Sequence, residues 1–306
     1  MAAVLVTGAQ GFIGRHLVGA LAADGMRVAG LGRGEAPSAS GGNGLSVWIS
    51  GDVTVDNLAL AARQAGPFDV VYHLAGGSSV GRSLTHSFDD FANTVDATAR
   101  LLDWLCSEMS GAALVVASSA AVYGSAAPGP IGEQAPLLPQ SPYGVHKVMM
   151  EQLVASRAAL CNLPSAIVRL FSVYGPQLRK QLLWDLCSRW EAGSSVMLGG
   201  TGAELRDWLH VHDAVRLLRL AAGAASKSAP VINGGTGRGT SVSTIAATAR
   251  AAWGDDRLTG FSGVARSGDP PSLIANVGRA QALGFEPRID VSAGVAEYVH
   301  WFRHSA

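Results

Sequence analysis

A tyrosine and a lysine stand four residues apart in the stretch SPYGVHK, which runs from Ser141 to Lys147. Proline suits the first turn of a helix, and the residues that follow have helical apolar spacing. On such a helix Tyr143 and Lys147 share one face. A nearby positive charge favours tyrosinate, so we expect the pKa of the phenol to fall toward working pH. The pair predicts a proton-exchanging tyrosine, and the alternative is an exposed pair on an ordinary helix.

Two serines close the apolar run ALVVASS, which we interpret as a strand. A hydroxyl at the end of a strand can bond a substrate oxygen that faces a catalytic tyrosine. Serines are also common in turns at strand ends. The presence of Tyr143 and Lys147, however, favours a chemical role for Ser118 and Ser119. We predict Ser119 as the third catalytic residue.

A glycine-rich turn, TGAQGFIG, stands between the first expected strand and the first expected helix. Its glycines Gly8, Gly11 and Gly14 would let the backbone approach a pyrophosphate, and the N–H groups of the helix start, at Phe12 and Ile13, point at the anion. A plain tight turn is the alternative. The position between a strand and a helix favours a dinucleotide site.

The end of the second expected strand bears on the choice of dinucleotide. A carboxylate roughly twenty residues after the glycines would bond the ribose 2′-hydroxyl of NAD. Gly32 and Arg33 occupy that place instead, and an arginine can hold the 2′-phosphate of NADP. The sequence therefore predicts an NAD(P) site with a preference for NADP, unless Arg33 only faces solvent.

Two further strand ends complete the predicted cofactor site. Asp52 and Val53 follow the third strand, where Asp52 could bond the adenine amino group or cap the next helix. The fourth strand ends in HLAGG, and its small residues would let a cofactor lie against the backbone. We therefore add Leu74, Ala75 and Gly76 to the predicted cofactor site.

These motifs lie on a chain that alternates strands and helices. Expected strands cover residues 3–7, 26–31 and 113–119, runs around SVWISGDV, FDVVYHLAG and PSAIVRLFSVYG, and later DWLHVHD and PVINGG; expected helices include 12–25, 56–65, 86–109 and the Tyr143 helix. Such alternation predicts an α/β fold, a Rossmann-type doubly wound parallel sheet that binds ligands at the carboxyl ends of its strands. We expect residues 1–172 to form this domain, with about 205–233 returning to it. Residues 173–306 would mainly form a smaller C-terminal α/β substrate-binding domain.

Composition excludes several classes of protein. Hydrophobic residues make up 48% and charged residues 15% of 306, which is typical of a compact globular protein. The formal net charge is zero, so the chain lacks the basic footprint of a nucleic-acid binder. No apolar run could span a bilayer, and no signal peptide is recognisable.

The three cysteines, Cys106, Cys161 and Cys187, are far apart in the sequence and odd in number. Their spacing matches no metal site and no disulfide framework. We interpret them as buried thiols in a reducing cytoplasm, and we predict no metal site and a cytoplasmic enzyme.

The motifs together resemble those of the extended short-chain dehydrogenase/reductase family, in its nucleotide-sugar epimerase, reductase and dehydratase branch. The resemblance covers nearly the whole chain, through TGAQGFIG, HLAG, SSAAVYG, the Tyr143–Lys147 pair, RLFSVYGP and RDWLHVHD. It implies the Rossmann fold, a nucleoside-diphosphate sugar as substrate, and a place in carbohydrate biosynthesis.

The resemblance also implies a role for individual residues. Tyr143 would be the acid and base on a sugar hydroxyl or ketone, Lys147 would bond the nicotinamide ribose, and Ser119 would bond the same substrate oxygen. Arg206 and Arg266 would hold substrate phosphates, which suits the planar guanidinium. The loop GGSSVGRS, with Ser78 and Ser79, would lie near the hexose.

The chain departs from the family pattern in two further places. Dehydratases of the family carry an acidic residue after the catalytic hydroxyl residue, where this chain has Ala120 and Ala121, so we discount dehydration. Ser172 replaces the asparagine that often contacts phosphate in this family, and we retain Ser172 as a substrate-binding residue.

Three functions remain open. The first is an epimerase that acts at C4 of the hexose through a transient 4-keto intermediate and regenerates its cofactor in every cycle. The second is an NADPH-dependent reductase of a 4-keto or 4-keto-6-deoxy nucleotide sugar, which Arg33 favours. The third is a cofactor-sensing protein without turnover, which would have no need for Ser119, Tyr143 and Lys147 together. We favour the epimerase.

The resemblance also implies a homodimer. Two long helices from each subunit would form a four-helix interface, here about residues 86–109 and 143–160. Apolar residues that could line it are Leu101, Leu102, Leu105, Met149 and Leu153, although the same residues could face the sheet.

Overall fold

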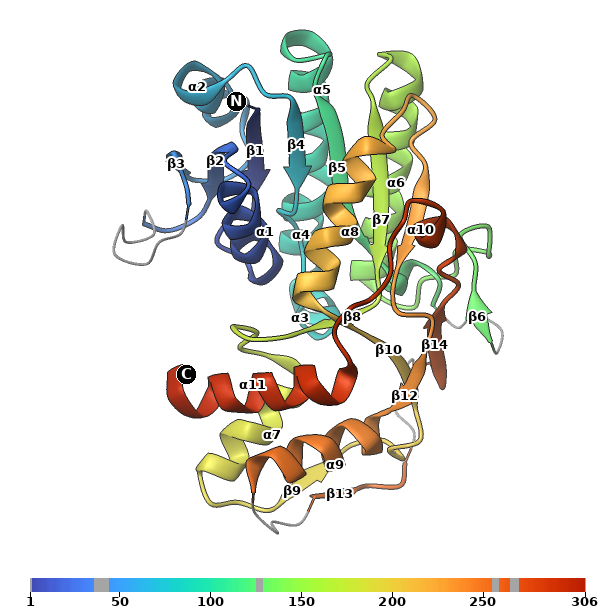
Figure 1. Cartoon of the computed structure of the whole chain (residues 1–306). Coiled ribbons are helices and arrows are strands. Elements are labelled where there is room, and N and C mark those ends of the chain that lie inside the picture. Colours follow the sequence, from blue (N-terminus) through green and yellow to red (C-terminus); the bar gives the residue numbers. More distant parts are fainter. Residues whose placement is uncertain (1, 36–43, 125–128, 255–258, 265–269, 306) are drawn as a thin grey trace. The chain divides into compact units, whose positions relative to one another are not determined.

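The computed structural model describes residues 2–35, 44–124, 129–254, 259–264 and 270–305. The chain separates into two compact units (Figure 1). The first comprises Met1–Gly124, Leu137–Arg169 and Val215–Ile232, and the second comprises Ser125–Pro136, Leu170–Ala214 and Asn233–Ala306. The chain thus returns to the first unit twice after leaving it.

A seven-stranded sheet forms the centre of the first unit within the described residues, in the order β11-β7-β5-β4-β1-β2-β3. Every pairing from β3 across to β5 is parallel. The strands are β1 (Ala3–Thr7), β2 (Arg27–Gly32), β3 (Val47–Ser50), β4 (Val70–His73), β5 (Ala113–Ser119), β7 (Ser165–Leu170) and β11 (Val231–Gly234). The predicted doubly wound parallel sheet is confirmed.

Helices cover both faces of this sheet (Figure 1). Helices α1 (Phe12–Ala23) and α8 (Val211–Gly223) lie on one face, and α2 (Val55–Ala65), α5 (Ala97–Glu108) and α6 (Pro142–Leu160) lie on the other. The second group buries its apolar stripe in one core with the strands; Leu101, Leu102 and Leu105 are at most 1% exposed there. These leucines therefore serve the core rather than a helix-to-helix interface.

The segment predicted as one helix over residues 86–109 is divided. It comprises α4 (Ser87–Phe91), a π-helical turn η2 (Ala92–Asp96) and α5, and an unforeseen helix α3 (Val80–Thr85) precedes it. The Thr98 hydroxyl donates to the Thr94 carbonyl at 2.6 Å. The Thr94 carbonyl that accepts this bond lies within the π-helical turn, and such side-chain bonds often bend a helix.

The run PSAIVRLFSVYG was predicted as one strand, and this is wrong. It divides into β7, which belongs to the first sheet, and β8 (Ser172–Tyr174), which pairs in parallel with β10 (Leu205–His210). Phe171 stands between them, and its N–H donates to the Gly234 carbonyl at 2.9 Å. The chain therefore passes from one sheet to the next without a change in its apolar pattern.

The second unit holds smaller sheets and a group of helices. One described sheet has the order β12-β10-β14-β6, with β8 added on β10, and a second joins β13 to β9. Its remaining strands are β6 (Pro130–Ile131), β9 (Val196–Leu198), β12 (Gly239–Ser241), β13 (Thr259–Phe261) and β14 (Ser272–Ala275), and its helices are α7 (Gln181–Glu191), α9 (Val242–Trp253), α10 (Gly278–Ala282) and α11 (Val291–Ser305). Aromatic side chains of α7, α9 and α11, among them Trp190, Trp253 and Phe302, meet in its core.

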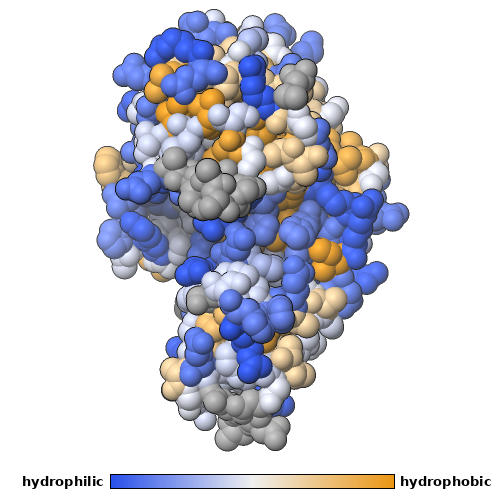
Figure 2. Space-filling view, turned by 60° about the vertical axis from the view of Figure 1, so that its left-hand side comes forward, coloured by the Kyte–Doolittle hydropathy of each residue, from blue (hydrophilic) through white to orange (hydrophobic). Residues whose placement is uncertain are grey.

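Apolar residues form most of the core, and polar residues lie mainly at the surface (Figure 2). Hydrophilic residues cover much of the face in Figure 2, and apolar residues form small groups between them. Among the described residues, no helix combines the length and apolarity that crossing a membrane requires.

The interpretation of the cysteines as three thiols is wrong. Cys106 near the end of α5 and Cys161 directly after α6 form a disulfide with a Cα–Cα distance of 5.7 Å, and Cys187 is a buried free thiol. The bonded residues are 55 positions apart. Their pairing depends on the packing of α5 against α6, which their spacing in the sequence does not reveal.

Thiol counting tests this disulfide. Unfolded without reductant, the protein should expose one thiol, and after reduction it should expose three. Closing a loop of this length stabilises a fold by on the order of 4 kcal/mol in the chain-entropy account, so Cys106→Ser should lower the free energy of unfolding by up to that amount. The double variant Cys106→Ser/Cys161→Ser should lose no more than the single one. Three thiols before reduction would contradict the assignment.

Candidate active site

The turn between β1 and α1 is so close to its neighbours that only glycine fits at two positions. Gly8 has a φ of +68°, and a Cβ there would lie 2.8 Å from the Ala75 nitrogen. A Cβ at Gly14 would lie 2.1 Å from the Gly8 oxygen. The N–H of Gly11 donates to that same oxygen at 2.9 Å. The three predicted glycines thus make one compact turn.

This turn fits the pyrophosphate of a dinucleotide. Helix α1 begins at Phe12, so the N–H groups of Phe12 and Ile13 belong to the first turn, where helical partners are lacking. No acidic residue stands in that turn. The exposed backbone donors and the positive end of the helix dipole are what a pyrophosphate requires.

A buried histidine at the end of β4 connects the end of β1 with α5 through hydrogen bonds. The Nδ1 atom of His73 lies 2.7 Å from the Thr7 hydroxyl, and its Nε2 atom lies 3.0 Å from the Thr98 hydroxyl. Thr7 in turn accepts from the N–H of Ala75 at 3.3 Å. Burial lowers the pKa of His73 to about 3, so the ring is neutral.

This network places the backbone of the predicted residues Leu74 and Ala75 directly against Gly8 of the glycine turn, whereas a Cβ at Gly76 would lie 3.5 Å from Lys147 Nζ. Sequence reasoning missed Thr7 and His73. The signal was present, since each is a polar residue at the last position of an apolar strand.

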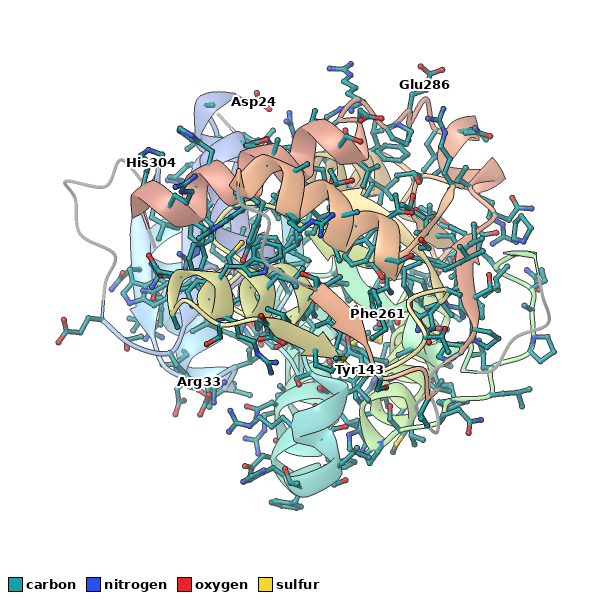
Figure 3. The ribbon with its side chains drawn as sticks, turned by 90° about the horizontal axis from the view of Figure 1, so that it is seen from below. Asp24, Arg33, Tyr143, Phe261, Glu286 and His304 are labelled. Carbon is teal, nitrogen blue, oxygen red and sulfur yellow. A yellow bond between two sulfur atoms is a disulfide. The ribbon has the colours of Figure 1, made fainter. Side chains whose placement is uncertain are left out.

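At the adenosine end of the predicted site, Arg33 and Asp52 face each other. Arg33 Nε lies 3.8 Å from Asp52 Oδ1, and the two side chains are 71% and 69% exposed. Figure 3 shows Arg33 at the periphery of the structure. Thr54, not Asp52, caps helix α2, and Val53 is buried. Of the two roles considered for Asp52, capping is therefore wrong.

Helix α6 begins as the sequence predicts. Pro142 is its first residue, and Ser141 caps it by accepting from the N–H of Gly144 at 3.2 Å. The N–H of Tyr143 donates to the Ser83 hydroxyl of α3 at 3.1 Å. Tyr143 therefore lies at the fixed start of α6, beside α3 and α4 (Figure 3).

The pKa of Tyr143 lies above its usual value, and the expectation of a lowered one is wrong in this structure. Loss of hydration is the largest cause, a hydrogen bond with Ser119 opposes it, and the charge of Asp90 adds to it. Lys147 Nζ lies 5.8 Å from the centre of the phenol ring. Ser119, Tyr143 and Lys147 are thus brought together, and Ser119 is the neighbour that assists ionisation.

Lys147 is a buried ammonium group. Its Nζ donates to the Ala117 carbonyl of β5 at 3.0 Å, and its side chain is 5% exposed. Burial lowers its pKa to about 8, while the charges of Asp90 and Glu151 oppose that change. A lysine with a pKa near neutrality can both donate a proton and accept one.

Behind this lysine lies a buried ion pair that sequence reasoning did not identify. Glu151, one helical turn after Lys147, accepts from Arg169 of β7 at 2.6 Å and from the Ser118 hydroxyl at 2.5 Å. Arg169 also donates to the Tyr123 hydroxyl at 3.0 Å. The two serines that close β5 therefore differ in role, because Ser118 serves this pair and Ser119 serves Tyr143.

The remaining predicted residues lie in two places. Ser78 and Ser79 follow β4, and Ser79 caps α3 by accepting from the N–H of Arg82. In the second unit, Ser172 opens β8, and Arg206 of β10 donates to the Leu205 and Pro270 carbonyls at 2.8 Å each. Arg266 lies outside the described residues.

In the ranges that the structure describes, no three His, Cys, Asp or Glu side chains gather so that they could hold a metal ion.

Known proteins resemble this chain over its whole length. The family model described as "NAD dependent epimerase/dehydratase family" matches residues 4–235. A UDP-glucose 4-epimerase of Azospirillum brasilense is 31% identical, over 95% of this chain and 89% of the relative. A dTDP-glucose 4,6-dehydratase of an Actinoplanes species is 30% identical, over 98% and 97%. The solved structure of MoeE5 in complex with UDP-glucuronic acid and NAD is 35% identical and covers both chains fully, with a TM-score of 0.88.

Lys147 gives the protein a pH-dependent stability. Its pKa is about 8 in the folded protein against 10.5 ordinarily, so between these values the unfolded chain binds more protons than the folded one. Lys147 should therefore contribute a rise in the free energy of unfolding across this window, on the order of 3 kcal/mol, seen as the difference between the wild type and Lys147→Met. Lys147→Met should lack this rise and be the more stable protein at neutral pH. Urea unfolding below and above the window measures it.

Lys227→Met is the matched control, because Lys227 is exposed. Its unfolding should follow the wild-type pH dependence. If Lys147→Met and the wild type differ by a constant amount at every pH, the buried ammonium has no such effect.

Proposed function

Because this chain belongs to the NAD dependent epimerase/dehydratase family and is an enzyme, we propose that it is an epimerase acting at C4 of a nucleoside-diphosphate hexose. The observation that carries the proposal is the grouping of Ser119, Tyr143 and Lys147 in the unit that contains the glycine-rich turn. The reaction would pass through a 4-keto sugar. Its product keeps the oxidation state of its substrate.

Each of the three side chains would have its own role in the reaction. Tyr143 takes the proton from the C4 hydroxyl and later returns it to the 4-keto oxygen. Ser119 donates a hydrogen bond to that oxygen and holds it beside the phenol. Lys147 would bond the ribose of the nicotinamide, and its Nζ lies 5.8 Å from the centre of the phenol ring. The glycine turn and the first N–H groups of α1 would hold NAD, which would supply reversible hydride transfer at C4.

Dehydration fits the site less well, although dehydratases are among the relatives. Elimination of water needs an acid and a base beyond the Tyr143 pair. The two positions after Ser119 are Ala120 and Ala121, in the short helix η3 (Ala120–Val122), and a methyl group transfers no proton. This supports epimerisation over dehydration.

We propose NAD as the cofactor, against the preference for NADP that Arg33 gave. Asp52 lies 3.8 Å from Arg33 and would repel the 2′-phosphate of NADP. The family name and the NAD in the MoeE5 complex agree with this choice. An NADPH-dependent reductase of a 4-keto nucleotide sugar is the second candidate, favoured by the exposed guanidinium of Arg33.

The substrate side of the site rests on fewer observations. We propose that Ser172, Arg206 and Arg266 bind the diphosphate and that Ser78 and Ser79 bind the hexose. UDP-glucose and dTDP-glucose in the relatives' names support a nucleoside diphosphate as the common part. A homodimer and a cytoplasmic location stay predictions.

The dinucleotide that the purified protein retains separates the two candidates. The protein would be denatured with nothing added, and the released dinucleotide identified by chromatography and mass. We expect NAD in near-stoichiometric amount, because an epimerase regenerates its cofactor in every turnover. An empty site that binds NADPH much more tightly than NADH would instead establish the reductase.

Tyr143→Phe tests catalysis itself. The substitution removes one oxygen and with it the proton transfer, so kcat for interconversion of UDP-glucose and UDP-galactose should fall roughly 10²–10⁴-fold. Ser119→Ala should give a smaller loss, since it removes only one hydrogen bond to the reacting oxygen. NAD content and thermal unfolding should stay near wild type in both. A Tyr143→Phe protein with full activity would rule out this mechanism, and a wild type without turnover would favour a cofactor sensor.

A further inference from the structure

A buried carboxylate–imidazole pair adjoins the predicted catalytic residues. Asp90 of α4 and His146 of α6 meet at 2.6 Å between Oδ2 and Nδ1. The two residues are 7% and 8% exposed. The ring of Phe91 packs edge-on against His146 with 5.6 Å between ring centres. The pair thus joins α4 to the turn of α6 that carries Tyr143 and Lys147.

The second oxygen of Asp90 faces the loop after β4. A Cβ at Gly77 would lie 1.8 Å from Oδ1 of Asp90, so the carboxylate rests against bare backbone. The N–H of Gly77 donates to the Thr94 hydroxyl at 2.8 Å. Gly77 is therefore held between α4 and η2, and only glycine fits there. It precedes Ser78 and Ser79 in the loop predicted to lie near the hexose.

The carboxylate also acts on the catalytic pair through its charge. Asp90 raises the pKa of both Tyr143 and Lys147. The charge of Glu151 acts on the pKa of Lys147 in the same direction. His73 is neutral, and Arg169 is bonded to Glu151. Asp90 is thus the one charge found to act on both members of the pair among the groups described.

Packing alone does not require a charge at this position. Burying a carboxylate is costly unless it is bonded, and the neighbouring Phe91 packs against α6 without one. The preceding residue, Asp89, is exposed and leaves its carboxylate in water. Asp90 is buried and hydrogen-bonded, whereas Asp89 is exposed. The burial of the Asp90 carboxylate therefore needs an explanation other than packing.

We propose that Asp90 is a positioning residue for proton transfer at Tyr143: His146 holds its carboxylate between Gly77 and α6, where its charge keeps Lys147 an ammonium and its oxygen fixes the substrate loop. The inference about turnover rests on the proposed function. The effect on Lys147 does not, and it can be measured without a substrate.

The three lysines of the chain make that measurement direct. With ¹³C-labelled lysine, NMR gives one titrating signal for each of Lys147, Lys180 and Lys227, and the signal missing in Lys147→Met is that of Lys147. In Asp90→Asn the Lys147 signal should titrate about one pH unit lower, because a negative charge that raises the pKa of Lys147 has been removed. Asp89→Asn should leave it in place.

Activity supplies the second readout. Since Asp90 raises the pKa of Tyr143 as well as that of Lys147, the pH profile of kcat/KM in Asp90→Asn should move as a whole toward lower pH, by about one unit. A merely structural role would lower the rate at every pH and leave the profile where it was. The double variant Asp90→Asn/His146→Gln keeps a hydrogen bond between two amides and removes the charge, so it tests the proposal if the single variant does not fold.

A Lys147 signal that stays in place in Asp90→Asn, or moves equally in Asp89→Asn, would overturn the proposal. So would a shifted signal with an unshifted kcat/KM profile. A wild type that binds NAD but turns over no sugar would instead contradict the epimerase, and the NMR result would still decide whether Asp90 acts on Lys147.

Discussion

The first unit is organised around one buried positive charge, the ammonium of Lys147. An ammonium removed from water is unstable unless carboxylates and carbonyls replace its hydration. The negative charges of Glu151 and Asp90 both stabilise the ammonium form of Lys147. Each carboxylate is itself buried and needs a partner, which Arg169 provides for Glu151 and His146 for Asp90. One functional charge on α6 therefore accounts for polar residues on α4, on β7 and further along α6.

The proposed cofactor site has the opposite requirement, since the pyrophosphate that it would hold is negatively charged. It meets this requirement with backbone N–H groups at the start of α1, which the glycines allow to lie close to β4. The hydrogen-bonded group next to it, His73 with two threonine hydroxyls, is neutral at any physiological pH. Binding of the pyrophosphate and transfer of the proton would thus depend on separate groups. The pyrophosphate site should change little over the pH range in which Lys147 titrates.

Features set by neighbours along the chain could be predicted from the sequence, and features set by folding could not. The glycine turn, the start of α6 at Pro142 and the alternation of strands and helices are local, and they were found. The pairs Cys106–Cys161 and Asp90–His146 join residues 55 and 56 positions apart, and nothing in either segment points to its partner. The pKa of Tyr143 was misjudged for a related reason, since spacing on a helix reveals a charged neighbour but not the loss of water.

The arrangement around Tyr143 also bears on which reaction the site suits. A reductase takes up one proton from solvent in each turnover, whereas an epimerase returns the proton that it removed. The charged groups beyond Tyr143 on α6 and on β7 are buried: Lys147, Glu151 and Arg169 are each at most 5% exposed. With these charged groups removed from water, Tyr143 can hold the proton during the life of a ketone and return it to the same oxygen. A tyrosine beside buried charged groups therefore favours the reaction that leaves the proton count of the sugar unchanged.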